Sequence, residues 1–142
     1  MRDWAEGVFA LGIIVGLGAA LFMFSGETLG EGTTDTTAPI TVDPDAAVRG
    51  EIIAGSTGCL ACHTTDGTPG SGPTWRGVAG SSRPLQSGEV VIADDVYLPN
   101  SILDPGSQVV VGFDNIMPPD YGDSLAEGEV GDLVDYIKSL TD

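Results

Sequence analysis

Five consecutive residues hold every cysteine and the only histidine of this 142-residue chain: Cys59-Leu-Ala-Cys62-His63. Two thiols separated by two residues and followed at once by an imidazole form the C-x-x-C-H pattern of covalent haem attachment. In that chemistry the cysteines form thioether bonds to the haem vinyl groups, and the histidine ligates iron. Because no other cysteine or histidine remains, the rest of the chain can hold no disulfide framework and no Cys/His catalytic pair.

Two other chemistries use cysteines at this spacing. A structural zinc site takes four ligands, usually Cys or His, and this chain offers three, of which Cys62 and His63 are adjacent. A thioredoxin-like redox pair lies near a βαβ pattern, whereas the residues around Cys59 are rich in Gly, Thr and Pro. We favour haem attachment over both of these chemistries, and the residues elsewhere in the chain provide a further test.

Met117 is the candidate for the second iron ligand. Met1 begins the chain and Met23 lies in an apolar run, so Met117 is the methionine that remains. The two prolines that follow it stiffen the backbone and favour an extended conformation, so the loop can hold a thioether in one place. The alternative is that Met117 fills a gap in the core, as methionines usually do. Beside a C-x-x-C-H motif, the ligand role is favoured.

Pro73 is the candidate for orienting the histidine. A ligating histidine normally donates its second ring N–H to a carbonyl or carboxylate. In Gly72-Pro73-Thr74-Trp75, Pro73 offers a carbonyl on a stiff backbone without a competing N–H. Gly-Pro is also common in ordinary turns, and taken alone the dipeptide favours a turn.

Residues 7–26 form a run without charged side chains. A helix of this length spans ~30 Å, the thickness of the hydrocarbon core of a bilayer. Arg2 precedes the run, whereas acidic residues follow it, so the positive-inside rule places the N-terminus in the cytoplasm. We expect a single-pass anchor in the inner membrane, with the rest of the chain on the periplasmic or extracytoplasmic side. A cleaved signal peptide is the alternative.

In the run of residues 7–26, Gly12 and Gly16 are four residues apart, and small residues at this spacing let membrane helices approach closely, which favours a helix partner. The alternative is that glycine is simply commoner in membrane helices. Residues 27–44 contain Gly, Thr, Pro and acids, which is typical of a flexible linker. The predicted organisation is therefore an anchor over 1–26, an acidic linker over 27–44 and one compact domain over 45–142.

Three elements are expected within the first two thirds of that domain. Asp45 is the predicted N-cap of a helix over 46–54, which Gly55 and Gly58 would end. Residues 89–92 form a short apolar stretch that could be extended. A second helix, capped by Asp94 or Asp95 or starting at Pro99, should run to Leu103 and stop at Asp104-Pro105-Gly106.

The last helix has the clearest pattern. Ser124 and Glu127 have the spacing of a capping box. The residues that then recur at helical spacing and should form one apolar face are Val130, Leu133, Val134, Ile137 and Leu140. This pattern predicts a helix that packs against the core and carries no chemistry of its own.

Residues 45–142 resemble a class I cytochrome c. The segments that carry the resemblance are Gly58–Thr64, Asp66-Gly67-Thr68, Gly72–Trp75, Gly77, Gly80, Ala93–Leu98, Ser101-Ile102, Val110–Phe113, Met117-Pro118 and Tyr136–Leu140. Their order is especially similar to the cytochrome c domain fused to subunit II of some bacterial cytochrome c oxidases. Such a subunit carries two membrane helices and a copper domain before the haem domain. Here a single apolar run and a short linker stand in their place, which suggests a separate anchored cytochrome.

The resemblance implies an all-α fold of small helices around one covalent haem c, preceded here by one transmembrane helix. It implies that Cys59 and Cys62 bind the haem, that His63 and Met117 ligate iron, and that the Pro73 carbonyl orients His63. The pocket lining implied by analogy is Trp75, Val110 and Phe113; the implied partners of the haem propionates are Arg83 and Tyr97; and the implied contact between the first and last helices is Gly50 against Tyr136.

The charge of the chain limits its partners. It has 21 acidic residues, five Lys and Arg, and a formal net charge of −16. A surface of this sign repels nucleic acid. Many cytochromes of the class dock through a ring of lysines, but this chain has one lysine, Lys138. Its docking face is therefore expected to be apolar or complementary to a basic patch.

These observations favour a non-enzymatic carrier of single electrons. Its expected partners are redox complexes: a quinol-oxidising complex on one side and a terminal oxidase or photosynthetic reaction centre on the other. The alternative is a haem enzyme or gas sensor that uses a vacant iron site, which would need Met117 displaced and a polar distal pocket.

Overall fold

The computed structural model describes residues 40–126 and 128–141. The predicted transmembrane run 7–26, with Gly12 and Gly16, and most of the predicted linker 27–44 lie outside these residues. In the described part of the chain, no helix has the length and apolar character that a bilayer crossing requires.

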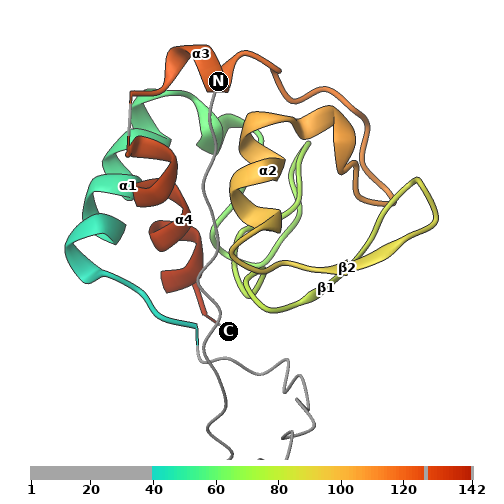
Figure 1. Ribbon diagram of the computed structural model, residues 1–142, viewed down its shortest axis with the longest axis horizontal. Helices are drawn as coiled ribbons and strands as arrows, with labels where there is room; N and C mark the ends of the chain where they lie inside the picture. The colour runs from blue at the N-terminus through green and yellow to red at the C-terminus, as the bar shows by residue number, and fades with distance from the viewer. Residues whose placement is uncertain (1–39, 127, 142) are drawn as a thin grey trace, which may run out of the picture. The chain divides into compact units, whose positions relative to one another are not determined.

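Helices dominate the described residues, as expected (Figure 1). In chain order the elements are α1 (Pro44–Ser56), η1 (Cys59–Ala61), β1 (Ser82–Pro84), β2 (Val90–Ile92), α2 (Tyr97–Leu103), η2 (Pro105–Ser107), α3 (Tyr121–Ser124) and α4 (Glu129–Ser139). The two strands form a short antiparallel hairpin, in which Arg83 is paired with Val91. The hairpin is an addition to the predicted all-α class, although the sequence had left open an extended conformation for residues 89–92.

Helix α1 begins earlier than the sequence suggested. Asp43, not Asp45, is its N-cap, and its carboxylate accepts hydrogen bonds from the backbone N–H groups of Asp45 (2.9 Å) and Ala46 (3.3 Å). Pro44 explains the difference, because proline suits the first helical position and its missing N–H is not needed there. Gly55 lies inside the helix instead of ending it, and the chain turns at Gly58, which has a φ of +82°.

The segment before α1 already contacts the domain. Lys138 donates a hydrogen bond of 3.5 Å to the carbonyl of Thr41 and forms an ion pair with Asp95. Pro44 and Thr41, which the sequence assigned to the linker, are thus the first helical residue and a contact of α4.

Helices α1 and α4 lie side by side (Figure 1). At Gly50 a methyl group would lie 2.8 Å from Cβ of Tyr136 and 2.6 Å from the carbonyl carbon of Asp132. The helices can therefore approach this closely only because residue 50 has no side chain. Arg49 reinforces the crossing through two hydrogen bonds to the Asp132 carboxylate, of 2.8 and 2.6 Å. The predicted contact between Gly50 and Tyr136 is present.

Helix α4 has the predicted face but not the predicted start. Leu133, Val134 and Ile137 are buried, and Val130 and Leu140 pack against the same core. The capping box was wrong: Ser124 ends the one-turn helix α3, and α4 begins only at Glu129, after Gly128 with a φ of +91°. The left-handed conformation at Gly128 interrupts the helical backbone that such a box needs.

Helix α2 stops at Leu103 as the sequence indicated, but it begins at Tyr97 and not at Pro99, with Val96 and not Asp94 or Asp95 at the N-cap position. The Asp94 carboxylate accepts hydrogen bonds from the backbone of Val96 (2.9 Å) and Tyr97 (2.8 Å). Pro99 is therefore in the first turn, where a missing N–H is tolerated. Leu103 is the last helical residue, directly before the Asp104-Pro105 step. Tyr97, Leu98 and Ile102 are buried, so α2 turns its apolar side to the core.

Candidate functional site

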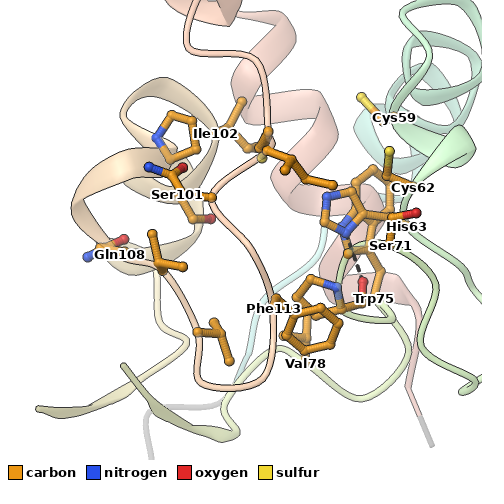
Figure 2. Close-up of a pocket in the computed structure, with 18 of the residues that line it drawn as sticks. Cys59, Cys62, His63, Ser71, Trp75, Val78, Ser101, Ile102, Gln108 and Phe113 are labelled. Atoms are coloured by element: carbon orange, nitrogen blue, oxygen red, sulfur yellow. Dashed lines mark hydrogen bonds between the residues drawn. The ribbon is translucent and has the colours of Figure 1, made fainter. Parts of the chain in front are cut away.

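A largely apolar pocket is formed between the C-x-x-C-H segment, α2 and the loop that carries Met117 (Figure 2). Its empty space, open solvent included, is about 1040 Å³. Every residue that the sequence singled out for cofactor binding lines this pocket: Cys59, Cys62, His63, Pro73, Trp75, Arg83, Tyr97, Val110, Phe113 and Met117. Residues up to 58 positions apart in the chain are thus brought to one cavity.

The turn η1 presents the two cysteines and the histidine together. The backbone N–H groups of Cys62 and His63 both donate to the carbonyl of Cys59, at 3.2 and 3.0 Å. Figure 2 shows the two sulfur atoms and the imidazole on the same side of the pocket. Both thiols are free, and Cys59 is buried. Both are therefore available for thioether bonds to a group in the cavity.

The zinc alternative finds no support in this arrangement. Among residues 40–126 and 128–141, no three His, Cys, Asp or Glu side chains are grouped as a metal-ion site requires. The cysteines have one histidine beside them and no fourth ligand, which a structural zinc ion would need.

The His63 ring is held by its Nδ1 atom. Nδ1 lies 2.8 Å from the carbonyl oxygen of Pro73, and because a carbonyl can only accept, the ring nitrogen donates. Burial lowers the pKa of His63, and the hydrogen bond to Pro73 opposes this by a smaller amount. The imidazole is therefore neutral at pH 7, with its proton on Nδ1 and the lone pair of Nε2 free to ligate a metal.

Two aromatic rings fix the plane of this imidazole. Trp75 stacks on His63 with ring centroids 5.1 Å apart and an angle of 23° between the planes. Tyr136 of α4 in turn packs edge-on against Trp75, with centroids 6.0 Å apart. The helix crossing at Gly50 and the orientation of His63 are thus parts of one packed unit.

Gly72 makes room for the ring. A methyl group at residue 72 would lie 2.7 Å from Cε1 and 2.9 Å from Nδ1 of His63. The Gly-Pro pair, which alone favoured an ordinary turn, thus has a second role: Gly72 provides space, and Pro73 provides the hydrogen-bond acceptor.

Met117 lies in the same pocket, on the loop between η2 and α3. Its side chain is half-buried, between the exposed residues Ile116 and Pro118. The loop reaches the cavity from a part of the chain far from His63 in sequence. A thioether is therefore present in the pocket that also holds the imidazole.

Two atoms of residues that line the pocket have no hydrogen-bond partners among the described residues: Nε of Arg83 and Oε1 of Gln108. Buried polar atoms normally have partners, so these atoms indicate a ligand with polar groups. Arg83 was predicted for this role. Gln108 was missed, because a single glutamine in a loop has no local sequence signal.

Together these residues fit a haem. An apolar macrocycle suits the apolar walls, a carboxylate suits the orphaned Nε–H of Arg83, and the two thiols and the imidazole are those that attachment requires. When bound, haem supplies one-electron chemistry at its iron. The chain's own residues orient the ligand nitrogen and exclude water from the apolar walls.

The comparisons with known proteins agree with this arrangement. The family model of cytochrome c matches residues 47–141, which include every residue that lines the pocket. No curated protein matches the chain. The match extends over about two thirds of the sequence and takes in both the α1–α4 crossing and the cavity. The chain therefore belongs to the cytochrome c family, as an electron-transfer protein with one covalently attached haem c.

Proposed function

We propose that this cytochrome is a class I electron carrier with a low-spin haem iron held between His63 and Met117. The observation that carries the proposal is that both side chains line one pocket and that His63 is fixed by Pro73 in the tautomer that leaves Nε2 free. Cys59 and Cys62 supply the thioether bonds. Trp75, Val110 and Phe113 form apolar walls, and Arg83 and Tyr97, which line the same pocket, hold the propionates.

The presence of Met117 in the pocket favours this carrier over an enzyme or gas sensor with a vacant iron site. A second protein ligand on the iron keeps small molecules off it, and a thioether opposite an imidazole raises the reduction potential. The alternative also lacks a second histidine to act as a distal base, since the chain has one histidine.

The test of the ligand pair uses Met117→Ala, with the neighbouring exposed Ile116→Ala as the matched control. The detergent-solubilised full-length holoprotein is reduced and mixed with carbon monoxide. The wild type and Ile116→Ala should bind it slowly, whereas Met117→Ala should bind it within the mixing time and have a lower reduction potential. Rapid binding by the wild type, or unchanged iron coordination in Met117→Ala, would contradict the proposal.

We further propose that residues 7–26 anchor the haem domain to the outer face of the inner membrane. The support is the uncharged run of residues in the sequence, with Arg2 on its N-terminal side. Alkaline carbonate washing should leave the full-length protein in the membrane pellet, and external protease should remove the haem domain from spheroplasts. Release by carbonate would contradict an uncleaved anchor.

The charge around the pocket supports a partner with a basic docking face. Between Arg83 and Lys138 the sequence has 11 acidic residues and no Lys or Arg. This stretch includes the Met117 loop and α3, where Asp114, Asp120 and Asp123 are exposed beside the exposed, apolar Ile116. An apolar contact surrounded by acids is complementary to a basic rim.

The partner class that we propose is a membrane redox complex, with a quinol-oxidising complex as donor and a terminal oxidase or reaction centre as acceptor. The organisation resembles the domain fused to oxidase subunit II, placed here on its own predicted anchor. Extraction in mild detergent and identification of the co-purifying subunits test this assignment. A redox complex that co-purifies through the full-length chain, but not through a chain lacking residues 1–39, would support it. A chain that is extracted alone would count against a permanent complex.

A further inference from the structure

The haem pocket contains a residue whose role is unassigned. Oε1 of Gln108 is buried and has no hydrogen-bond partner in the described part of the chain, although Gln108 lines the pocket. In the same cavity Nε of Arg83 is also without a partner among these residues. An unmet buried polar group destabilises a fold, so its persistence calls for a partner from outside the described residues.

Strand pairing explains why both side chains face the pocket. Leu85 and Val110 are opposite each other in an antiparallel bridge. The flanking hydrogen bonds run from Gln86 N to Val109 O (2.8 Å) and from Val111 N to Pro84 O (2.9 Å). Side chains two residues apart on an extended segment share a face, and directly opposed residues do so as well. Arg83 and Gln108 both line the pocket, but they lie two residues from the bridge in opposite directions along the paired segments.

The placement of Gln108 near the pocket does not depend on which amide atom is inward. A half-turn of the amide group exchanges the places of Oε1 and Nε2 without moving the rest of the side chain. The buried position can therefore present an N–H donor. Figure 2 shows Gln108 on the side of the cavity opposite Cys59, Cys62 and His63. The group at that end would be the one farthest from the thioether bonds.

The haem has two carboxylates, and this pocket offers them a single cation. Among the described residues that line the pocket, Arg83 is the only Lys or Arg. A second carboxylate in a largely apolar cavity needs neutral donors, because a buried charge without them is costly. The two N–H groups of a glutamine amide meet that need without adding charge.

We propose that Gln108 is a positioning residue for the cofactor: its amide donates to a haem propionate and thereby raises the reduction potential of the iron. A hydrogen bond draws negative charge away from the iron side of the carboxylate and so disfavours the oxidised, more positive iron. This inference rests on the covalent haem of the family and is independent of the membrane anchor and the redox partners.

The test compares substitutions at Gln108 and Gln86 in the full-length holoprotein. Gln108→Leu removes the donors, and Gln108→Glu puts a negative charge in their place. Gln86→Glu is the matched control: residue 86 lies on the paired segment, but it is exposed and its amide donates to the carbonyl of Phe113. The readouts are the potential from spectroelectrochemistry and the carboxylate bands of the redox-difference infrared spectrum.

We expect Gln108→Leu to lower the potential and shift a propionate band, and Gln108→Glu to lower the potential further. Gln86→Glu should leave both readouts as in the wild type. The visible spectrum of each variant should stay low-spin, because neither iron ligand is changed.

Wild-type potential and carboxylate bands in Gln108→Leu would overturn the proposal. So would an equal fall in potential in Gln86→Glu and Gln108→Glu, since that would show a charge effect without a specific contact. If Gln108→Glu does not accumulate as holoprotein, Gln108→Asn replaces it. This variant keeps a shorter amide, and the proposal requires its potential to fall between those of the wild type and Gln108→Leu.

Discussion

Gly72 and His63 are in contact so close that the glycine cannot carry a side chain: a Cβ on residue 72 would lie 2.7 Å from Cε1 of the imidazole. Gly72 is not among the glycines with a positive φ, so its backbone conformation is open to other residues. The constraint is therefore one of space. It falls on the ring that Pro73 orients and Trp75 stacks on.

Gly72→Ala is expected to displace the His63 ring and weaken its hydrogen bond to Pro73. We predict a several-fold lower yield of low-spin holoprotein, measured from the visible spectrum relative to total protein. Gly55→Ala is the control, because residue 55 is helical and no atom lies within 4 Å of its added Cβ. A normal spectrum and yield in Gly72→Ala would show that the ring tolerates the methyl group.

Gly50→Ala should destabilise the crossing of α1 and α4. The added methyl group would lie 2.8 Å from Cβ of Tyr136 and closer still to the backbone of Asp132, so the helices must separate. Overpacking of this kind costs about 1–3 kcal/mol, which thermal unfolding of the holoprotein can measure. Gly131→Ala, on the exposed side of α4 with open space around the added Cβ, should be neutral or stabilising. Equal stability of the two variants would contradict this account.

The ion pair between α1 and α4 predicts a loss of stability in acid. The hydrogen bonds from Arg49 lower the pKa of Asp132, burial opposes this, and the charge of Arg49 lowers the pKa further. A carboxyl whose pKa is lower in the folded state than its unfolded value of about 3.9 contributes stability above that value. The contribution is lost as the pH falls through the folded pKa.

In Asp132→Asn the free energy of unfolding should therefore decrease less steeply as the pH is lowered below 5. The reason is that residue 132 then takes up no proton on unfolding. Arg76→Gln, which removes a positive charge outside the two helices, should keep the wild-type profile. Chemical unfolding of the holoprotein at a series of pH values gives the comparison. A wild-type slope in Asp132→Asn would show that the pair is not linked to folding.

The acidic surface near Met117 predicts the salt dependence of electron exchange. The wild type should react faster with a cationic reagent, hexaammineruthenium, than with anionic ferricyanide after correction for driving force, and the difference should shrink as salt screens the charges. Asp120→Asn with Asp123→Asn should lower the rate with the cation about threefold to tenfold at low salt. Glu51→Gln in α1, which does not line the pocket, serves as the control in stopped-flow measurements. If the double substitution and Glu51→Gln lower the rate equally, the rate depends on the net charge of the protein and not on the acidic surface near Met117.

Much of the site follows from the sequence, because the covalent motif fixes one end and a single histidine leaves no choice of ligand. Once Cys59, Cys62 and His63 are assigned to the haem, few residues are left as candidates for the second iron ligand and for the acceptor that orients His63. The apolar stripe of α4 was equally clear, since its spacing is local.

The features that the sequence did not reveal depend on competition between neighbouring residues or on pairing between distant segments. Asp43 and Asp45 both resemble caps, and the proline between them decides the outcome. Gly128 adopts a left-handed conformation that cancels the apparent box at Ser124. Gln108 enters the pocket because residue 110 is bridged to residue 85, and no pattern near residue 108 announces that partner.

Lys138 has a consequence for chemical labelling. It is the only lysine in the sequence, 10% of its side chain is exposed, and its ammonium group is engaged by Asp95 and by the carbonyl of Thr41. Amine acylation of this domain should therefore be slow while those contacts last. The rate at which Lys138 is acylated therefore reports how often the segment that carries Thr41 detaches from the end of α4.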